Sequence, residues 1–256
     1  TAGSPHVFGV WHRIEERARL LARYAHQKGA RKFAILAPDS AYGARAAGAF
    51  VHEVETLGGK VVFDTRYPKG STTFIEPVKA LAKQSADALF VPDSAAKLEL
   101  IAPQLRSLDF FVRAPGDRGA PRKGRPIALF SLAEGLSARF VANAGRYAEG
   151  AVFAPGFYPD ESDNRIGPFV VKFRDAYGED PGPFDAYAYD AALCVRAVVE
   201  QGADSRARVA ELLQASQVEG VTGTIRFTPS RERQGGGLLF RLVRDPSGGF
   251  VIRAER

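Results

Sequence analysis

The chain of 256 residues contains no methionine and only one cysteine. Without a methionine, Thr1 is not a start of translation, so we expect further sequence upstream of it. A single cysteine, Cys194, excludes an internal disulfide and a zinc site built from cysteines. Cys194 lies in an Ala- and Val-rich stretch with a helical pattern. That setting predicts a buried structural thiol rather than a nucleophile.

The sequence also lacks the patterns that mark enzymes. The four histidines, which all precede residue 53, form no His-x-x-x-His pair: His6, His12, His26 and His52. There is no Gly-x-Ser-x-Gly elbow, no Gly-x-Gly-x-x-Gly motif and no phosphate loop. The Asp and Glu residues show no distinctive pairing. We therefore expect a binding protein with no catalytic residues, no metal and no cofactor.

Long apolar runs are absent, and the positive charge is unevenly spread. No run approaches the roughly 20 residues that cross a bilayer. The net charge of +6 and the pI near 9.5 raise the possibility of nucleic-acid binding. However, the densest basic cluster is interleaved with Gly and Pro and lacks stacking aromatics: Arg113, Arg118, Arg122, Lys123 and Arg125. This composition predicts a mobile, solvated surface loop, and we expect no nucleic-acid partner.

What the sequence does contain is a repeated tetrapeptide. Pro-Asp-Ser-Ala occurs at residues 38–41 and again at 92–95. Each copy follows a short apolar run, at 33–37 and 88–91, and each precedes a helical pattern. In parallel α/β sheets, the turns that leave the carboxyl ends of strands form the ligand crevice. The two copies therefore predict where a binding cleft lies.

Predicted strands and helices alternate over the first 150 residues. We expect helices at 13–28, 41–57 and 95–108, another from a Ser71 or Thr72 cap to Gln84, and strands at 32–37, 60–65, 87–91, 126–131 and 150–155. This alternation predicts an α/β fold, in which right-handed crossovers place helices on both faces of a parallel sheet. Helices at 166–177, 183–201 and 205–216 and strands at 224–227, 238–243 and 250–253 follow. A compositional break at 155–163 indicates a second lobe.

Several short motifs occur in a fixed order along the chain. They lie at residues 29–36, 42–43, 57–62, 67–74, 169–178, 188–191 and 220–227. In order and spacing they resemble the type I periplasmic solute-binding proteins, in the branch similar to leucine/isoleucine/valine-binding proteins. No single motif is specific, but the ordered set across nearly the whole chain is.

The resemblance implies two α/β lobes that are joined by three hinge strands and close on a small ligand. Residues 12–150 with 237–256 would form one complete lobe, the carboxyl-terminal one. Residues 155–228 would be the return segment of the amino-terminal lobe, whose first half is absent, and residues 1–11 match a hinge. A partial lobe leaves apolar faces uncovered, at a cost of roughly 25 cal/mol per Å². We therefore expect a longer chain, a second chain or a second copy to cover this surface.

The resemblance also assigns residues to the ligand site. Tyr42 matches a tyrosine that lines the cleft, Glu134 matches an acid that holds the ligand's ammonium group, and Tyr158 borders the cleft. The second turn departs from the amino-acid binders, because Asp93, Ser94 and Ala95 stand where an aromatic residue is expected. This departure argues against a branched-chain amino acid as the ligand.

Structural roles remain open for the same residues. Tyr42 could instead pack the first turn of its helix, Glu134 could be solvent-exposed, and Tyr158 could pack the hinge. The remaining residues of the two turns are suited to capping helices: Asp39, Ser40, Asp93 and Ser94. Tyr189 and Asp190 lie on a helix, and we expect them to be structural.

Three functions agree with this sequence. The first is an extracytoplasmic solute-binding protein that delivers a small polar ligand, such as an amino acid or amide, to the permease of an ABC importer. The second is an envelope lipoprotein domain of the same fold that regulates a partner such as a cell-wall synthase, because residues 150–160 resemble the penicillin-binding protein activator branch. The third is a ligand-sensing regulatory domain of a receptor or transcription factor.

Overall fold

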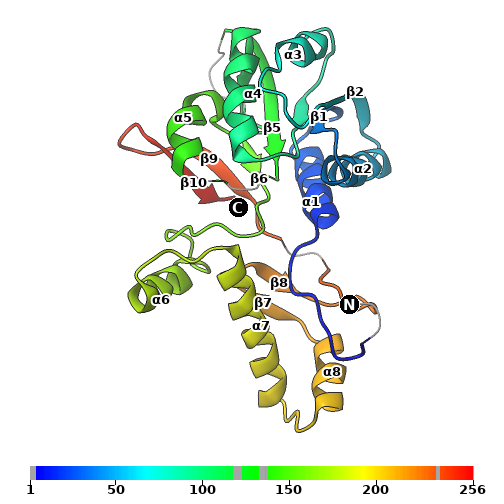
Figure 1. The fold of residues 1–256 in the computed structure, drawn as a ribbon, viewed down its shortest axis with the longest axis vertical. Helices are drawn as coiled ribbons and strands as arrows, with labels where there is room; N and C mark the ends of the chain where they lie inside the picture. Colours follow the sequence, from blue (N-terminus) through cyan, green and yellow to red (C-terminus); the bar gives the residue numbers. More distant parts are fainter. Residues whose placement is uncertain (1–3, 118–122, 133–135, 137, 235–236, 256) are drawn as a thin grey trace. The chain divides into compact units, whose positions relative to one another are not determined.

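The computed structural model describes residues 4–117, 123–132, 136, 138–234 and 237–255, which are drawn as a ribbon in Figure 1. The chain divides into two compact units. The sheet unit comprises residues 17–155 with 239–256, and the helical unit comprises residues 1–16 with 156–238. Each unit is therefore built from segments that are distant in the sequence.

The sheet unit contains one eight-stranded sheet, in the order β10-β9-β6-β5-β3-β1-β2, with β4 paired to β5 beside this path. The strands that run in one direction are β1 (Lys32–Pro38), β2 (Lys60–Tyr67), β3 (Ala88–Phe90), β4 (Phe110–Val112), β5 (Arg125–Ser131) and β6 (Val152–Phe153). At one edge, β9 (Phe240–Arg244) pairs antiparallel with β6 and with β10 (Phe250–Ala254). The central strands are buried along most of their length, because helices cover both faces of the sheet.

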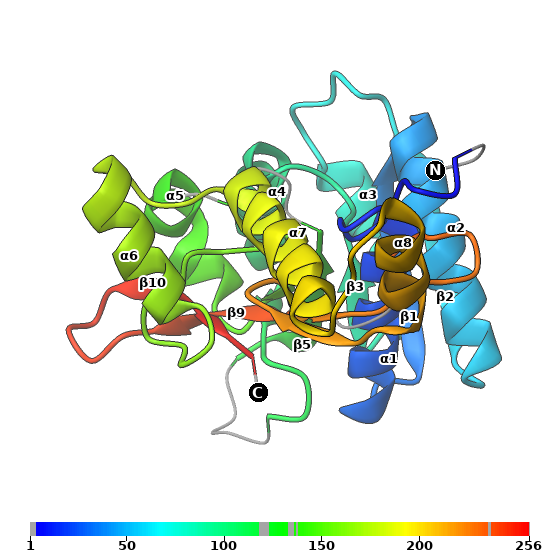
Figure 2. The same ribbon diagram turned by 90° about the horizontal axis from the view of Figure 1, so that it is seen from below.

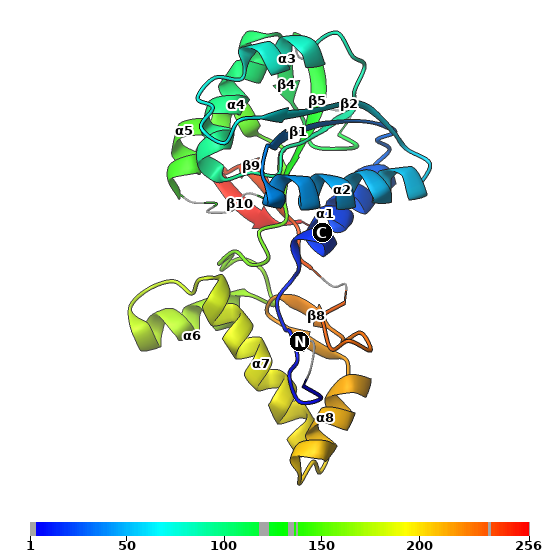
Figure 3. The ribbon, with the colours of Figure 1, turned by 45° about the vertical axis from the view of Figure 1, so that its right-hand side comes forward.

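The helices of the sheet unit are α1 (Ile14–Gln27), which begins at the boundary between the units, α2 (Ala41–Thr56), α3 (Ile75–Leu81), α4 (Ala95–Ser107) and α5 (Ala138–Ala148). Right-handed crossovers place α2 on one face of the sheet and α3, α4 and α5 on the other, as Figure 3 shows. Aromatic rings fill the core on the α2 face. Phe50 of α2 stacks on Phe90 of β3 at 4.2 Å between ring centroids, and Phe33 of β1 meets Phe50 edge-on.

The helical unit is built from α6 (Gly167–Tyr177), α7 (Pro183–Glu200) and α8 (Arg206–Ala215), with a two-stranded sheet of β7 (Val218–Gly220) and β8 (Gly223–Ile225). Helices α7 and α8 lie side by side (Figure 2). Their shared core contains Cys194, Val198, Leu213, Ile225 and Phe227. Burial raises the pKa of the Cys194 thiol to about 11, which confirms the expected structural cysteine.

A buried polar network joins α7 to the β7–β8 turn. The Asp190 carboxylate accepts hydrogen bonds from the backbone N–H groups of Val221 (2.7 Å) and Thr222 (3.0 Å) and from the Thr222 hydroxyl. Arg233 in turn donates to the Thr222 hydroxyl and to the carbonyls of residues 222–224. A Cβ at Gly220 would lie 2.4 Å from an Asp190 oxygen, so only glycine fits there. Asp190 is therefore structural, as expected.

The structure confirms the α/β class and most of the expected elements, but one helix begins later than its sequence pattern predicts. We expected a helix from a Ser71 or Thr72 cap, whereas α3 begins at Ile75, and the Phe74 side chain makes no capping bond. The reason is that α4 holds this segment in a non-helical path. Lys97 Nζ donates to the Ser71 carbonyl (2.5 Å), and Gln104 Oε1 accepts from the Phe74 N–H (2.6 Å).

The basic cluster is also only partly a loop. Arg125 begins strand β5, where its guanidinium lies 4.9 Å from the Phe110 ring centroid and donates to the Gln84 carbonyl (2.6 Å). These contacts anchor Arg125, so the solvated-loop interpretation is wrong for this residue. Arg118 and Arg122 lie outside the described residues. The sequence patterns also did not predict α5, β4 and β7. Strands β4 and β7 have three residues each.

Candidate functional site

The two Pro-Asp-Ser-Ala turns lie at the same edge of the sheet. Strand β1 is paired in parallel with both β2 and β3, so the carboxyl ends of all three strands point the same way. The turn after β1 is fastened to the end of β2, because the Asp39 N–H donates to the Tyr67 carbonyl at 2.7 Å. The repeat therefore does mark neighbouring turns at the carboxyl edge.

The first turn presents Tyr42 at the start of α2. The Ser40 hydroxyl accepts a hydrogen bond from the Gly43 N–H at 3.0 Å, which confirms Ser40 as the cap of this helix. A Cβ at position 43 would lie 2.1 Å from the Pro38 carbonyl oxygen, so Gly43 lets the helix start directly against the end of the strand. Tyr42 is half-buried in this first helical turn.

The second turn presents a carboxylate whose two oxygens are both held. Asp93 Oδ2 accepts from the Tyr67 hydroxyl and Oδ1 accepts from the Ser94 N–H, each at 2.6 Å. Ser94 occupies the capping position of α4, but its side chain makes no capping hydrogen bond, so the capping role expected for that hydroxyl is wrong. The backbone there is instead held by Asp93. Ala95, the first residue of α4, is buried.

Tyr67 is a residue of this site that sequence reasoning missed. It ends β2 and reaches past the end of β1, which lies between β2 and β3, to bond Asp93. Tyr67 is 2% exposed, and its ring packs edge-on against Phe74 at 4.8 Å between ring centroids. Burial, together with the hydrogen bond to the Asp93 carboxylate and its charge, raises the Tyr67 pKa well above the ordinary value. The one signal in the sequence that could have indicated this role is an aromatic residue at the end of a predicted strand.

Two other residues were expected at the ligand site. Glu134 is outside the described residues. Tyr158 is half-buried in the helical unit, shortly before a loop that leads into α6.

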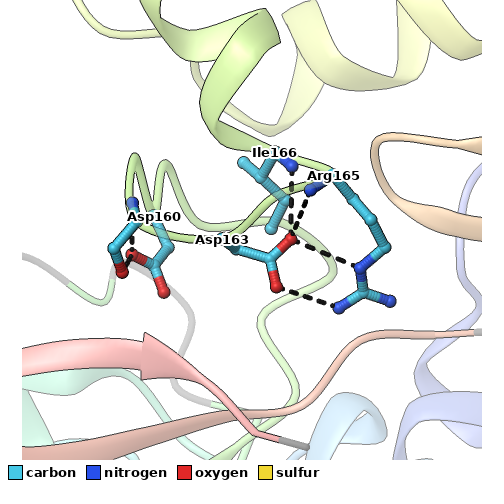
Figure 4. Close-up of polar contacts among 5 residues, drawn as sticks. Asp160, Asp163, Arg165 and Ile166 are labelled. Atoms are coloured by element: carbon cyan, nitrogen blue, oxygen red, sulfur yellow. Dashed lines mark hydrogen bonds and ion pairs between the residues drawn. The ribbon is translucent and has the colours of Figure 1, made fainter.

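That loop is held by the carboxylates shown in Figure 4. Asp163 accepts from the N–H groups of Arg165 (2.9 Å) and Ile166 (3.3 Å), and it forms an ion pair with the Arg165 guanidinium (3.2 Å). Burial opposes ionisation, but the hydrogen bonds from Arg165 outweigh it and hold the Asp163 pKa below its ordinary value. Nearby, Asp160 accepts from the Ser162 hydroxyl at 2.6 Å. This geometry accounts for the fixed path into α6 without involving a ligand.

The helical unit carries a cavity of about 710 Å³ between α6 and α7. Its aromatic lining comes from both helices: Phe169, Phe173, Tyr177 and Tyr189. In the described part of the chain, eight of the nine exposed large apolar side chains lie in this unit, Ile75 being the exception. The cavity thus combines aromatic rings with the charged side chains of Arg165, Lys172, Glu179 and Asp185.

Other kinds of site find no support among the residues described. No group of three or more His, Cys, Asp or Glu side chains there is arranged to hold a metal ion. Over the same residues, no helix combines the length and apolar character that crossing a membrane requires.

The raised pKa of Tyr67 should be visible in an alkaline titration. Folding raises the pKa values of Tyr67 and Tyr24, and Tyr24 is buried and donates to Glu255 at 2.6 Å. The stability that these protonated tyrosines contribute is therefore complete below the unfolded pKa of about 10 and is lost as the pH rises above it. Part of the tyrosinate absorbance should appear only as the protein unfolds. Tyr67→Phe should lower this late-appearing absorbance by the contribution of one tyrosine, whereas Tyr177→Phe, at an exposed tyrosine, should leave it unchanged. An unchanged late-appearing absorbance in Tyr67→Phe would contradict the raised pKa of Tyr67.

Comparison with known proteins identifies the family. A family model described as periplasmic binding protein matches residues 1–244. A search of curated proteins finds no match. A solved branched-chain amino acid ABC transporter protein from Rhodospirillum rubrum is 24% identical, with a TM-score of 0.81, over 98% of this chain and 68% of that one.

Two further structures show the same fold. One is a branched-chain amino acid ABC transporter periplasmic ligand-binding protein from Burkholderia xenovorans (19% identity, TM-score 0.78, 98% of this chain and 65% of that one). The other is an ABC transporter substrate-binding protein from Desulfitobacterium hafniense in complex with Leu (24% identity, TM-score 0.65, 98% and 69%). This chain thus spans about two thirds of the length of these structures. The chain belongs to the periplasmic binding protein family, has its type I α/β fold, and is a ligand binder rather than an enzyme.

Proposed function

We propose that this protein binds a small polar solute, amino-acid- or amide-like, and delivers it to the permease of an ABC importer outside the cytoplasm. The observation that carries the proposal is the convergence of Tyr42, Asp93 and Ser94 at the carboxyl edge of the sheet unit. An aromatic ring offers an apolar face to a ligand stem, while a carboxylate and a hydroxyl orient its polar end. The similar structures named as ABC transporter proteins, one of them in complex with Leu, support the proposed transport role.

Glu134 and Tyr158 remain in the proposal on the strength of the family resemblance. Buried Ala95 contributes space rather than a polar contact, because its side chain is only a methyl group. The ligand end near α4 is therefore bound by polar groups in place of an aromatic ring.

A second candidate is a role in binding a partner protein. The exposed apolar surface of the helical unit favours this role, and so does the distribution of apolar residues around α7. One face of α7 is buried in the core through Cys194 and Val198, while Phe184 (83% exposed), Val195 (47%) and Val199 (52%) form a stripe that faces solvent. Helices with apolar residues on two faces are normally covered on both. Such a stripe is covered either by a partner protein, as this second function requires, or by further polypeptide of the same fold, since the similar structures are longer than this chain.

Solute binding predicts a ligand-dependent melting temperature. In a thermal-shift screen against amino acids, amides and other small metabolites, a true ligand at about 100 times its dissociation constant should stabilise the protein by roughly 2.7 kcal/mol. Tyr42→Ala should weaken that binding by about tenfold, which is about 1.4 kcal/mol. Lys79→Ala, on the exposed surface of α3, should bind normally. Flat melts with every compound would argue against solute binding and for the partner-binding role.

The apolar stripe predicts self-association of the 256-residue chain when nothing else covers it. Sedimentation equilibrium should show a molecular mass that increases with concentration. The double variant Phe184→Ser/Val195→Ser should shift the protein toward monomer, because it removes exposed apolar area from the stripe. The matched control is Ile75→Ser, which changes the exposed apolar side chain of the sheet unit. A wild-type chain that stays monomeric at all concentrations would contradict an uncovered apolar face.

A further inference from the structure

The cavity between α6 and α7 lies beside an outer helix of the helical unit. Helix α7 lies between α6 and α8, so α6 forms one flank of this unit (Figure 1, Figure 2). Two aromatic side chains of α6 line the cavity as a tilted pair, Phe173 and Tyr177, at 4.5 Å between ring centroids. Tyr177 is 71% exposed. Covering these rings with another surface would remove apolar area from water, which is favourable.

Two of the four charged residues that line the cavity have partners within the helical unit. Arg165 forms an ion pair with Asp163 at 3.2 Å. Asp185 accepts a hydrogen bond from the Gly182 N–H at 2.8 Å. Both side chains therefore have structural roles, one in the loop before α6 and the other in the cap of α7.

The other two charged residues, Lys172 and Glu179, carry opposite charges that no other described residue neutralises. Both line the cavity, and both are exposed. Within the described residues, neither forms an ion pair or a side-chain hydrogen bond, with the other or with a third residue. In the sequence they stand on either side of Phe173 and Tyr177. A free cation and a free anion therefore flank the aromatic pair.

This order of residues is self-complementary. In a two-fold interface, residue i of one copy meets residue j of the other, and j meets i. The midpoint of Phe173 and Tyr177 is residue 175, and the midpoint of Lys172 and Glu179 falls beside it. One axis near residue 175, with the α6 helices antiparallel, thus pairs each cation with an anion and each ring with a ring. A parallel arrangement would place like charges together, which is unfavourable.

We infer that the helical unit binds a second copy of this chain through antiparallel α6 helices, with Lys172 of each copy paired to Glu179 of the other. The aromatic rings supply the affinity, because their contact removes apolar surface from water. The ion pairs set the register, since exposed pairs add little stability but disfavour wrong arrangements. The inference rests on the partner-binding role proposed above and names the partner.

A charge exchange tests this register. Lys172→Glu places acidic groups opposite each other, and Glu179→Lys places basic groups opposite each other. Sedimentation equilibrium should show that each variant weakens self-association by about tenfold. The double variant Lys172→Glu/Glu179→Lys should restore the wild-type association, because opposite charges face each other again.

Two controls accompany the charge exchange. Lys83→Glu makes the same charge change at an exposed position of the sheet unit and should associate like the wild type. All variants should melt near the wild-type temperature, since the substituted side chains are exposed.

The other outcomes separate this inference from the functions proposed above. If the wild-type chain associates but the single variants associate equally well, or the double variant is not restored, the α6 register is overturned and association through the α7 stripe stands. If the wild-type chain stays monomeric at all concentrations, a second copy does not cover these rings, and the inference fails together with the predicted self-association. Solute binding is tested separately by the thermal-shift screen.

Discussion

The parallel direction of β2, β1, β3 and β5 is the constraint on which the rest of the sheet unit depends. Because these strands run the same way, each must return through a helix, and the turns that begin those helices gather at one edge. Residues far apart in sequence, such as Tyr42, Tyr67 and Asp93, thereby come to the same edge. The shared direction also makes the Tyr67–Asp93 bond possible. Tyr67 ends β2 and Asp93 follows β3, and these two strands lie on either side of β1.

The two units are stabilised by different interactions. The sheet unit buries its central strands and packs Phe33, Phe50 and Phe90 between sheet and helix. Within its described residues, the helical unit has only a two-stranded sheet, which is marginal alone. Its small core is supplemented by the buried Asp190–Thr222–Arg233 network. The opposite side of α7 is exposed through Phe184, Val195 and Val199. The sheet unit thus carries the polar edge, and the helical unit carries the apolar surface.

The sequence predicted those features that depend on residues close together in the chain. The alternation of strands and helices, the Ser40 cap and the buried Cys194 all follow from patterns within a few residues, and the structure bears them out. The late start of α3 and the role of Tyr67 could not be predicted this way. Both depend on partners some 26 to 30 residues away, namely Lys97, Gln104 and Asp93, whose positions are set by the strand order. The ligand-contacting roles of Tyr42, Asp93 and Ser94 stay predictions.

The central claim is that a small solute binds at the carboxyl edge of the sheet unit, and hydrogen exchange with and without a ligand tests it most directly. Mass spectrometry of peptides should show slower exchange on ligand binding in the turns at residues 39–43 and 92–97, because the ligand orders and covers their backbone amides. The helical cavity lined by Phe169 and Tyr189 provides the internal comparison. Protection confined to α6 and α7, with both Pro-Asp-Ser-Ala turns unchanged, would contradict this account.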